Sequence, residues 1–279
     1  MKFTRYENIK SFADDTLEIL LENEVQNNLP IAFTKNERGA DTSDWMLGSI
    51  KDASGGIVLI AACTPPHNIV LYETRNKPND AAVNLLINEL KSMGFTPPGV
   101  LAEQGLARRF AQTHSGGKFR TNLSMNIMRL DKVNEIPKAP GHCRPIREDD
   151  LFYLPYWDMA FAEECNIEVP DILTSVERKR ATLDRNTHYI WEDRHPVSMA
   201  GNSRNTENGA VVTAVYTPPH YRGKGYASST VAKLSQILLE RGNKFCCLFA
   251  DAANPISCGI YRKIGFCDVC VFDELKFDC

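Results

Sequence analysis

The stretch from Val211 to Ser229, VVTAVYTPPHYRGKGYASS, decides the fold that we predict for this chain. It begins as an apolar strand, breaks at Pro218-Pro219, and runs through Arg222-Gly-Lys-Gly225 directly into a helical pattern. Glycines let backbone N–H groups approach a ligand, and a helix N-terminus adds unpaired N–H groups and a partial positive charge. This order of strand, glycine loop and helix predicts a site for a phosphate or diphosphate.

Other phosphate-binding loops fit this stretch less well. A Walker A loop has four residues between its glycines and ends in Gly-Lys-Ser/Thr, whereas only Lys224 separates Gly223 from Gly225. A Rossmann G-x-G-x-x-G loop would need a third glycine where Ser228 stands. Considered by itself, the loop could also be a solvated glycine-rich turn that binds nothing.

A second segment downstream strengthens the prediction of a ligand site. A strand from Phe245 to Ala250 is followed by Asn254 as a helix N-cap and Pro255 at the first helical position. The helix is predicted to end at Gly265.

Together the two segments resemble the GNAT superfamily of acyl-CoA-dependent N-acyltransferases. The family motif R/Q-x-x-G-x-G/A is matched by Arg222, Gly225 and Ala227. The later motif N-x-x-S/A…Y-x-K-x-G-F is matched by Asn254, Ser257, Tyr261, Lys263, Gly265 and Phe266. Residues 142–161 resemble the opening strand and helix of the same fold, so the resemblance covers about residues 142–279.

The resemblance implies that acetyl-CoA is the co-substrate and that a primary amine of a small molecule or peptide attacks its thioester directly. It implies that the backbone at the end of the strand pairs with the pantetheine arm, and that the loop amides hold the diphosphate. The coenzyme-binding residues would be Val215, Tyr216, Thr217, Arg222, Gly223, Lys224, Gly225, Tyr226, Ala227, Ser228, Asn254 and Ser257.

Tyr261 is the catalytic residue that the resemblance implies, as the acid that protonates the departing thiolate. The alternative is a core tyrosine packed on Phe266. Many family members use a glutamate near the strand before the loop as the base, but no acidic residue lies between Ala210 and Tyr216. The base is left open among Glu163, Glu164, Glu192 and Glu207.

The length of 279 residues and an internal repeat favour two domains. The repeat places Gly56–His67 opposite Gly209–His220, and both segments end in Thr-Pro-Pro-His. A Pro- and Gly-containing stretch at 131–142 is the expected linker. We expect an α/β fold of two GNAT-like domains, each a mostly antiparallel sheet flanked by helices. Residues 1–135 would be a degenerate copy without a coenzyme loop, and 141–279 the catalytic domain.

The composition of the chain excludes some classes of binding partner. A formal charge of −3 without a basic stripe argues against nucleic acid, and no apolar run is long enough for a membrane helix. Nine irregularly spaced cysteines, with Cys267 and Cys270 on an expected strand, favour reduced thiols in a cytoplasmic protein and no metal. The alternatives are a non-catalytic acyl-CoA sensor and, with less support, an aminoacyl-tRNA-dependent transferase. A homodimer is left open.

Overall fold

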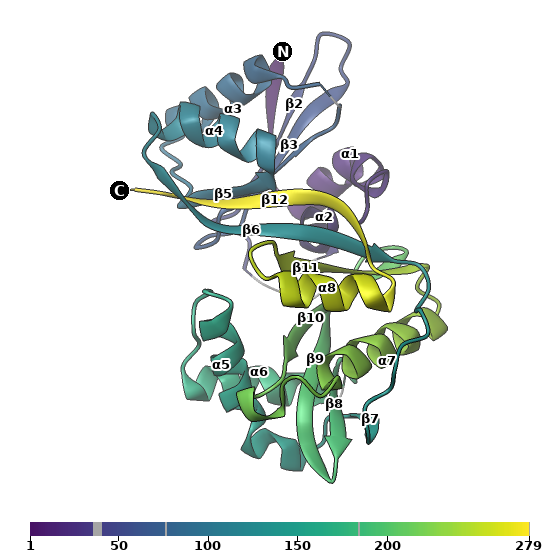
Figure 1. Ribbon diagram of the computed structural model, residues 1–279. Helices are drawn as coiled ribbons and strands as arrows, with labels where there is room; N and C mark the ends of the chain where they lie inside the picture. The colour runs from purple at the N-terminus through teal and green to yellow at the C-terminus, as the bar shows by residue number, and fades with distance from the viewer. Residues whose placement is uncertain (36–40, 76, 184, 279) are drawn as a thin grey trace. The chain divides into compact units, whose positions relative to one another are not determined.

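The chain forms two compact units in a computed structural model that describes residues 1–35, 41–75, 77–183 and 185–278 (Figure 1). The first unit consists of Met1–Ile127 and Val269–Cys279, and the second of Met128–Asp268. The sequence placed the division at 135–141. In the structure the chain passes into the second unit after Ile127, and its last strand returns to the first unit.

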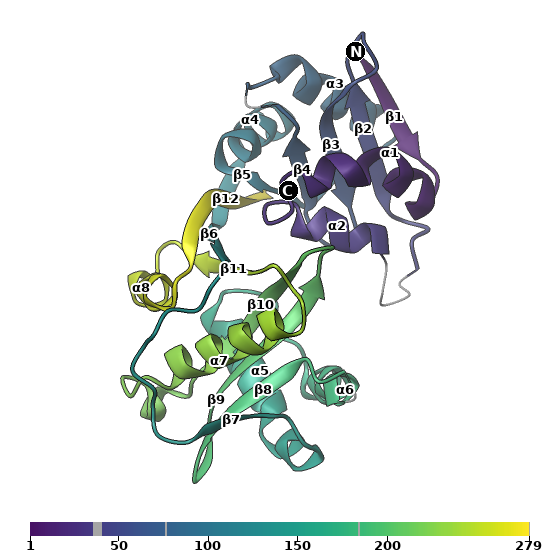
Figure 2. The same cartoon turned by 90° about the vertical axis from the view of Figure 1, so that its right-hand side faces the viewer.

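The first unit is a sheet with helices on both faces (Figure 2). Its elements are β1 (Lys2–Tyr6), α1 (Ile9–Leu21), α2 (Asn28–Lys35), β2 (Met46–Lys51), β3 (Ile57–Cys63), β4 (Ile69–Glu73), α3 (Asp80–Ser92), β5 (Gly99–Glu103), α4 (Gln104–Ser115), β6 (Phe119–Leu130) and β12 (Cys267–Phe277). The strand order is β1-β2-β3-β4-β5-β12-β6, with β4 and β5 parallel. Strand β3 is buried along its whole length because α3 and α4 cover one face and α1 covers the other.

The second unit has the same kind of architecture. Its elements are β7 (His142–Pro145), the 3₁₀ turn η1 (Glu148–Phe152), α5 (Leu154–Glu164), α6 (Ile172–Leu183), β8 (His188–Asp193), β9 (His195–Asn205), β10 (Gly209–Tyr216), the 3₁₀ turn η2 (Pro219–Tyr221), α7 (Tyr226–Glu240), β11 (Phe245–Asp251) and α8 (Pro255–Ile264). The strand order is β11-β10-β9-β8-β7, parallel between β10 and β11 and antiparallel elsewhere. Helices α7 and α8 pack on one core and α5 on another. The predicted mixed α/β fold is confirmed.

The sequence repeat pairs the wrong strands. In the first unit β3 is followed by another strand, β4, before α3 begins, whereas β10 leads directly into α7. By order of elements β10 therefore corresponds to β4, and Asn68–Glu73, which the repeat set opposite the glycine loop, is mostly strand. The error arose because a Pro-Pro pair ends any apolar strand and so marks a local break, not a position in the topology.

Residues 131–141 have no regular secondary structure and are mostly exposed, but hydrogen bonds hold them against the second unit. The amide of Asn134 donates to the Ile264 carbonyl at 2.8 Å, and that of Ala139 donates to the Ser229 hydroxyl at 2.8 Å. The indole of Trp191 donates to the Pro140 carbonyl at 2.7 Å. These bonds fix the segment along the second unit.

The eight cysteines that the structure describes form no disulfide with one another. Burial raises the pKa of Cys63, Cys246 and Cys270 to about 12, so these thiols are unreactive at neutral pH. Cys267 and Cys270 lie on β12, as predicted. None of the helices within the described ranges is long and apolar enough to cross a membrane.

Candidate functional site

The parallel strands β10 and β11 separate in the middle of the second unit. They pair only from Gly209 opposite Phe245 to Val211 opposite Cys247, although β10 continues to Tyr216 and β11 to Asp251. Beyond the pairing, the backbone edge of β10 that faces β11 has no strand partner in the part of the chain that the structure describes. An unpaired strand edge is suited to an extended ligand that carries amide groups.

The separation coincides with a bulge in β10. Ala214 has a φ of +50°, and the pairing of β10 with β9 shifts register between Thr213 and Tyr216. Hydroxyl groups fix the end of the strand, since Ser198 donates to the Tyr216 carbonyl at 3.2 Å and Thr217 donates to the Ser198 hydroxyl at 2.8 Å. Nothing in the sequence around Ser198 predicts this role.

The glycine loop follows η2 and leads directly into α7, in the order that the sequence predicted. Gly223 has a φ of +77° and Gly225, the N-cap of α7, a φ of +80°. No side chain caps the helix, and its first internal bond runs from the Ser229 amide to the Gly225 carbonyl. The amides of residues 226–228 therefore have no acceptor within the helix. A positive end of a helix dipole with three free N–H groups is an anion site.

The side chains around the loop are engaged with the protein. The Arg222 guanidinium donates to the Thr217 carbonyl at 2.8 Å and to both Glu164 oxygens at 2.6 and 2.7 Å. The Tyr226 hydroxyl donates to Asp193 at 2.5 Å, which leaves its backbone amide as the group for a ligand. Lys224 is exposed. The link between Arg222 and Glu164 was not predicted.

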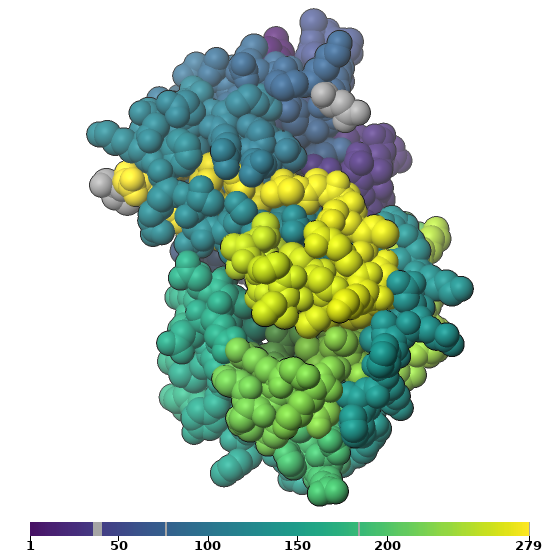
Figure 3. All heavy atoms as spheres, viewed as in Figure 1, coloured from purple at the N-terminus to yellow at the C-terminus, as the bar shows by residue number. Residues whose placement is uncertain are grey.

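Helix α8 presents the second predicted set of residues. The Asn254 side chain accepts from the Ser257 amide at 3.1 Å, so Asn254 is the predicted N-cap, and Gly265 ends the helix with a φ of +117°. Figure 3 shows the surface hollowed between α8 and the loop before α7, with α5 alongside. This hollow lies where β10 and β11 separate.

Tyr261 is 9% exposed, and its ring meets Phe266 edge to face at 5.9 Å between centroids. Its hydroxyl makes no hydrogen bond to any residue in the described ranges. Burial raises the pKa of Tyr261 well above its usual value, and the nearby thiols of Cys165 and Cys258 add to the shift. The hydroxyl therefore stays protonated and has its hydrogen-bonding capacity available.

The connection from β4 to α3 in the first unit, which the structure describes at residues 74–75 and 77–79, corresponds to the glycine loop by order of elements. It contains no glycine, and its helix α3 is capped by Asn79, whose side chain accepts from the Ala82 amide at 3.1 Å. Glu73 accepts from the Asn79 amide at 2.7 Å. The amides of Asn79 and Ala82 are thus engaged by a protein carboxylate and a capping side chain, whereas no side-chain cap is formed at the start of α7 among the described residues.

The four candidate bases differ in their surroundings. Glu163 is exposed, Glu164 is held by Arg222, and a hydrogen bond from Arg144 lowers the pKa of Glu192. Glu207 precedes β10, at the end of the strand opposite the loop, and a strand of this length spans about 25 Å. No candidate combines a free carboxylate with a contact to the loop.

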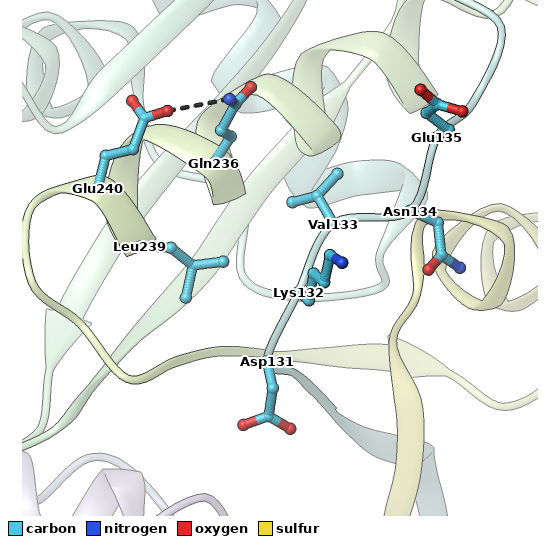
Figure 4. Close-up of a pocket in the computed structure, with 8 residues that line it drawn as sticks. All are labelled: Asp131, Lys132, Val133, Asn134, Glu135, Gln236, Leu239 and Glu240. Carbon is cyan, nitrogen blue, oxygen red and sulfur yellow. Dashed lines mark hydrogen bonds between the residues drawn. The ribbon is translucent and has the colours of Figure 1, made fainter.

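Two pockets of about 400 Å³ each lie between α7 and the packed segment 131–143. Figure 4 shows the one at the end of α7, where Gln236 donates to Glu240. Neither pocket includes a predicted coenzyme-binding residue. No cluster of three or more potential metal ligands exists within the described ranges.

Comparison with known proteins identifies the family of the segment that contains the glycine loop and α8. Residues 152–266 match the model of the Acetyltransferase (GNAT) family, which confirms the resemblance predicted from the sequence: the chain contains a GNAT domain. No curated protein matches the chain.

Solved structures share the fold across the whole chain. A GCN5-related N-acetyltransferase from Sphaerobacter thermophilus is 12% identical, with a TM-score of 0.69 over 99% of this chain and 95% of its own. A GNAT-family acetyltransferase from Colwellia psychrerythraea is 10% identical, with a TM-score of 0.65 over all of both chains. A tandem GNAT protein from the clavulanic acid pathway is 12% identical, with a TM-score of 0.60 over 98% of this chain and 97% of its own.

Proposed function

We propose that the protein is an acetyl-CoA-dependent N-acetyltransferase with one coenzyme site, in its second unit. The observation that carries the proposal is the set of free amides at residues 226–228, placed directly after a strand whose edge is unpaired. The family match supports acetyl transfer in general. A diphosphate on the amides would leave the pantetheine arm to pass along β10 toward Tyr261.

The coenzyme-binding residues divide by the part of the ligand that each would hold. The free edge of β10, near Val215, would pair with the pantetheine amides. The Tyr216 and Thr217 carbonyls already accept from Ser198 and Arg222. The loop from Gly223 to Ser228 would hold the diphosphate through its backbone. Asn254 has its oxygen bonded to Ser257, so its side-chain N–H groups are the ones that can face the ligand.

The transfer needs an amine nitrogen close to the thioester carbon and a proton for the sulfur. The nitrogen–carbon bond forms and the carbon–sulfur bond breaks. The Tyr261 hydroxyl gives its proton to the departing sulfur and regains one from the amine nitrogen. A backbone N–H at the β10 bulge, near Val215 or Tyr216, would stabilise the negative charge that develops on the carbonyl oxygen.

The test is release of free thiol from acetyl-CoA in the presence of primary amines, followed together with the melting temperature of the protein. We expect acetyl-CoA to raise the melting temperature and amines to promote thiol release. If millimolar acetyl-CoA produces no shift, the proposal is wrong.

A second candidate function is an acyl-CoA-binding module without catalysis. It is favoured by the absence of an acidic residue on β10 and by the pairing of Glu164 with Arg222. A melting shift with acetyl-CoA, without thiol release from a broad amine panel, would support this second function.

The Glu164–Arg222 pair leads to a prediction about coenzyme affinity. Because Glu164 places a carboxylate beside the proposed anion site, Glu164→Gln should tighten acetyl-CoA binding by about two- to fivefold, the range for exposed ion pairs. Isothermal titration calorimetry measures this. Asp268→Asn is a matched control, because the Asp268–Arg262 pair is equally exposed and lies away from the loop. Equal effects of the two substitutions would contradict the prediction.

A further inference from the structure

Exposed large apolar side chains are concentrated in one stretch of the second unit. Phe152 is 88% exposed, Leu173 72% and Tyr156 62%. Ile167, Val169 and Ile172 are exposed in the same stretch, so six such side chains occur between residues 152 and 173. We call residues 152–173 the apolar face; they comprise the end of η1, α5, the connecting loop and the start of α6. Concentrations of exposed apolar side chains on soluble proteins mark interaction sites.

The same region is acidic. From Glu148 to Glu177 there are nine acidic residues and no lysine, arginine or histidine; Arg147 and Arg178, at its two ends, are exposed. Four are neutralised by ion pairs: Glu148 with Arg180, Asp150 with Arg144, Asp158 with Lys179 and Glu164 with Arg222. The other five are exposed and form no ion pair within the described ranges: Asp149, Glu163, Glu168, Asp171 and Glu177. A cationic partner would complement this charge.

The helices that carry the apolar face are joined firmly to each other. The Ser175 hydroxyl donates to the Pro155 carbonyl at 3.2 Å and to Asp158 at 3.1 Å. Lys179, which is buried, forms an ion pair with Asp158 at 2.5 Å. A buried pair of this kind fixes the contact between α5 and α6, so the apolar face has a defined shape.

The apolar face adjoins the proposed catalytic site. Glu164, at the end of α5, contacts Arg222 of the glycine loop. The Trp157 ring lies 6.1 Å from the ring of Tyr216 at the end of β10. A molecule held on the face is therefore next to the place where the thioester would lie.

We propose that the acetyl acceptor is a lysine side chain in a polypeptide segment that is both basic and apolar, and that this segment docks on the apolar face. The inference rests on the proposed function. Six exposed apolar side chains on two helices and a loop present more surface than a small amine covers, whereas a peptide of about ten residues can span it. The five exposed carboxylates outnumber the exposed guanidinium groups of Arg147 and Arg178 and favour a basic segment over a neutral or acidic one.

The experiment uses synthetic twelve-residue peptides in which a single central lysine is the only amine. The probe peptide carries leucines and arginines around the lysine; in one variant serines replace the leucines, and in another glutamates replace the arginines. Nα-acetyl-lysine amide serves as the small acceptor. We expect kcat/KM for the probe to exceed that for each of the other three by about a hundredfold, and KM to rise with salt.

Variants of the apolar face identify the surface. Leu173→Ser and Tyr156→Ser should each raise KM for the probe about tenfold, since each removes a side chain that binding would bury, and should leave KM for Nα-acetyl-lysine amide unchanged. Val269→Ser is the control, because Val269 is 46% exposed and lies on β12 in the first unit. An equal loss with Val269→Ser would overturn the proposal.

A labelled peptide with acetyl-lysine in place of the lysine measures docking without turnover, by fluorescence anisotropy in the presence of coenzyme A. Docking that depends on Leu173 without acetylation of any amine would overturn the proposed function but not the docking surface. Acetylation of Nα-acetyl-lysine amide as efficiently as the probe would overturn the inference and leave the function intact. A stable dimer in sedimentation that Leu173→Ser dissociates would also overturn it, because the face would then bind a second copy.

Discussion

Gly225→Glu is expected to abolish the thermal stabilisation of the protein by acetyl-CoA. A ligand at a hundred times its Kd stabilises by about 2.7 kcal/mol, which corresponds to roughly 5–10 °C for a domain of this size. The substitution places a carboxylate among the amides of residues 226–228, where the diphosphate would bind. There is room for the side chain, because the nearest atom to an added Cβ is that of Ala139 at 3.9 Å.

Gly242→Glu is the matched control for this experiment. Gly242 follows the other end of α7, has a φ of +99°, and has no atom within 4 Å of an added Cβ. Both substitutions impose the strain of a side chain at positive φ, about 1–2 kcal/mol, and should lower the melting temperature of the free protein by similar amounts. Only Gly225→Glu should remove the response to acetyl-CoA. A full response in Gly225→Glu would place the coenzyme elsewhere.

The sequence predicted the local features of the site because each depends on residues close together in the chain. Asn254, Pro255 and Gly265 define the start and end of α8, and the structure has them as N-cap, first residue and C-cap. Gly223 and Gly225 have the positive φ that only glycine adopts without strain. Capping and turn preferences act within a few residues, so a single sequence is enough to predict them.

Features that depend on distant residues could not be predicted in this way. Arg222 and Glu164 are 58 residues apart, and nothing in either segment indicates that they meet. The repeat was misaligned by one strand because Thr-Pro-Pro-His marks the end of a strand and carries no information about which strand it is. Strand β12 belongs to the first unit because Phe272–Lys276 pairs with β5, which lies about 170 residues earlier in the sequence.

The two units differ in their capacity to bind an anion at the start of α3 and of α7, the helices that follow the fourth strand of each unit. The difference depends on which groups accept hydrogen bonds from the amides there. In the first unit Glu73 accepts from the Asn79 amide and the Asn79 side chain accepts from the Ala82 amide, which stabilises the helix and leaves fewer amides for an anion. In the second unit Gly225 leaves the amides of residues 226–228 without a side-chain cap, at a cost of roughly a few tenths of a kcal/mol relative to a good cap. A free helix N-terminus is retained at that cost where a ligand compensates for it, and this supports a single coenzyme site.

Tyr261→Phe is expected to lower kcat for thiol release by about a hundredfold to ten-thousandfold, the contribution of a general acid, while acetyl-CoA still raises the melting temperature. The fold should be unaffected, because the ring contact with Phe266 is kept and the hydroxyl has no hydrogen-bond partner among the described residues.

Tyr189→Phe provides the opposite control. Its hydroxyl accepts from Arg241 at 2.5 Å and lies away from the loop, so the substitution should cost about 1 kcal/mol of stability and leave kcat unchanged. Stopped-flow measurement of thiol release separates the two effects. An unchanged kcat in Tyr261→Phe would mean that the departing sulfur takes its proton from solvent. Tyr261 would then have only a packing role, in contact with Phe266.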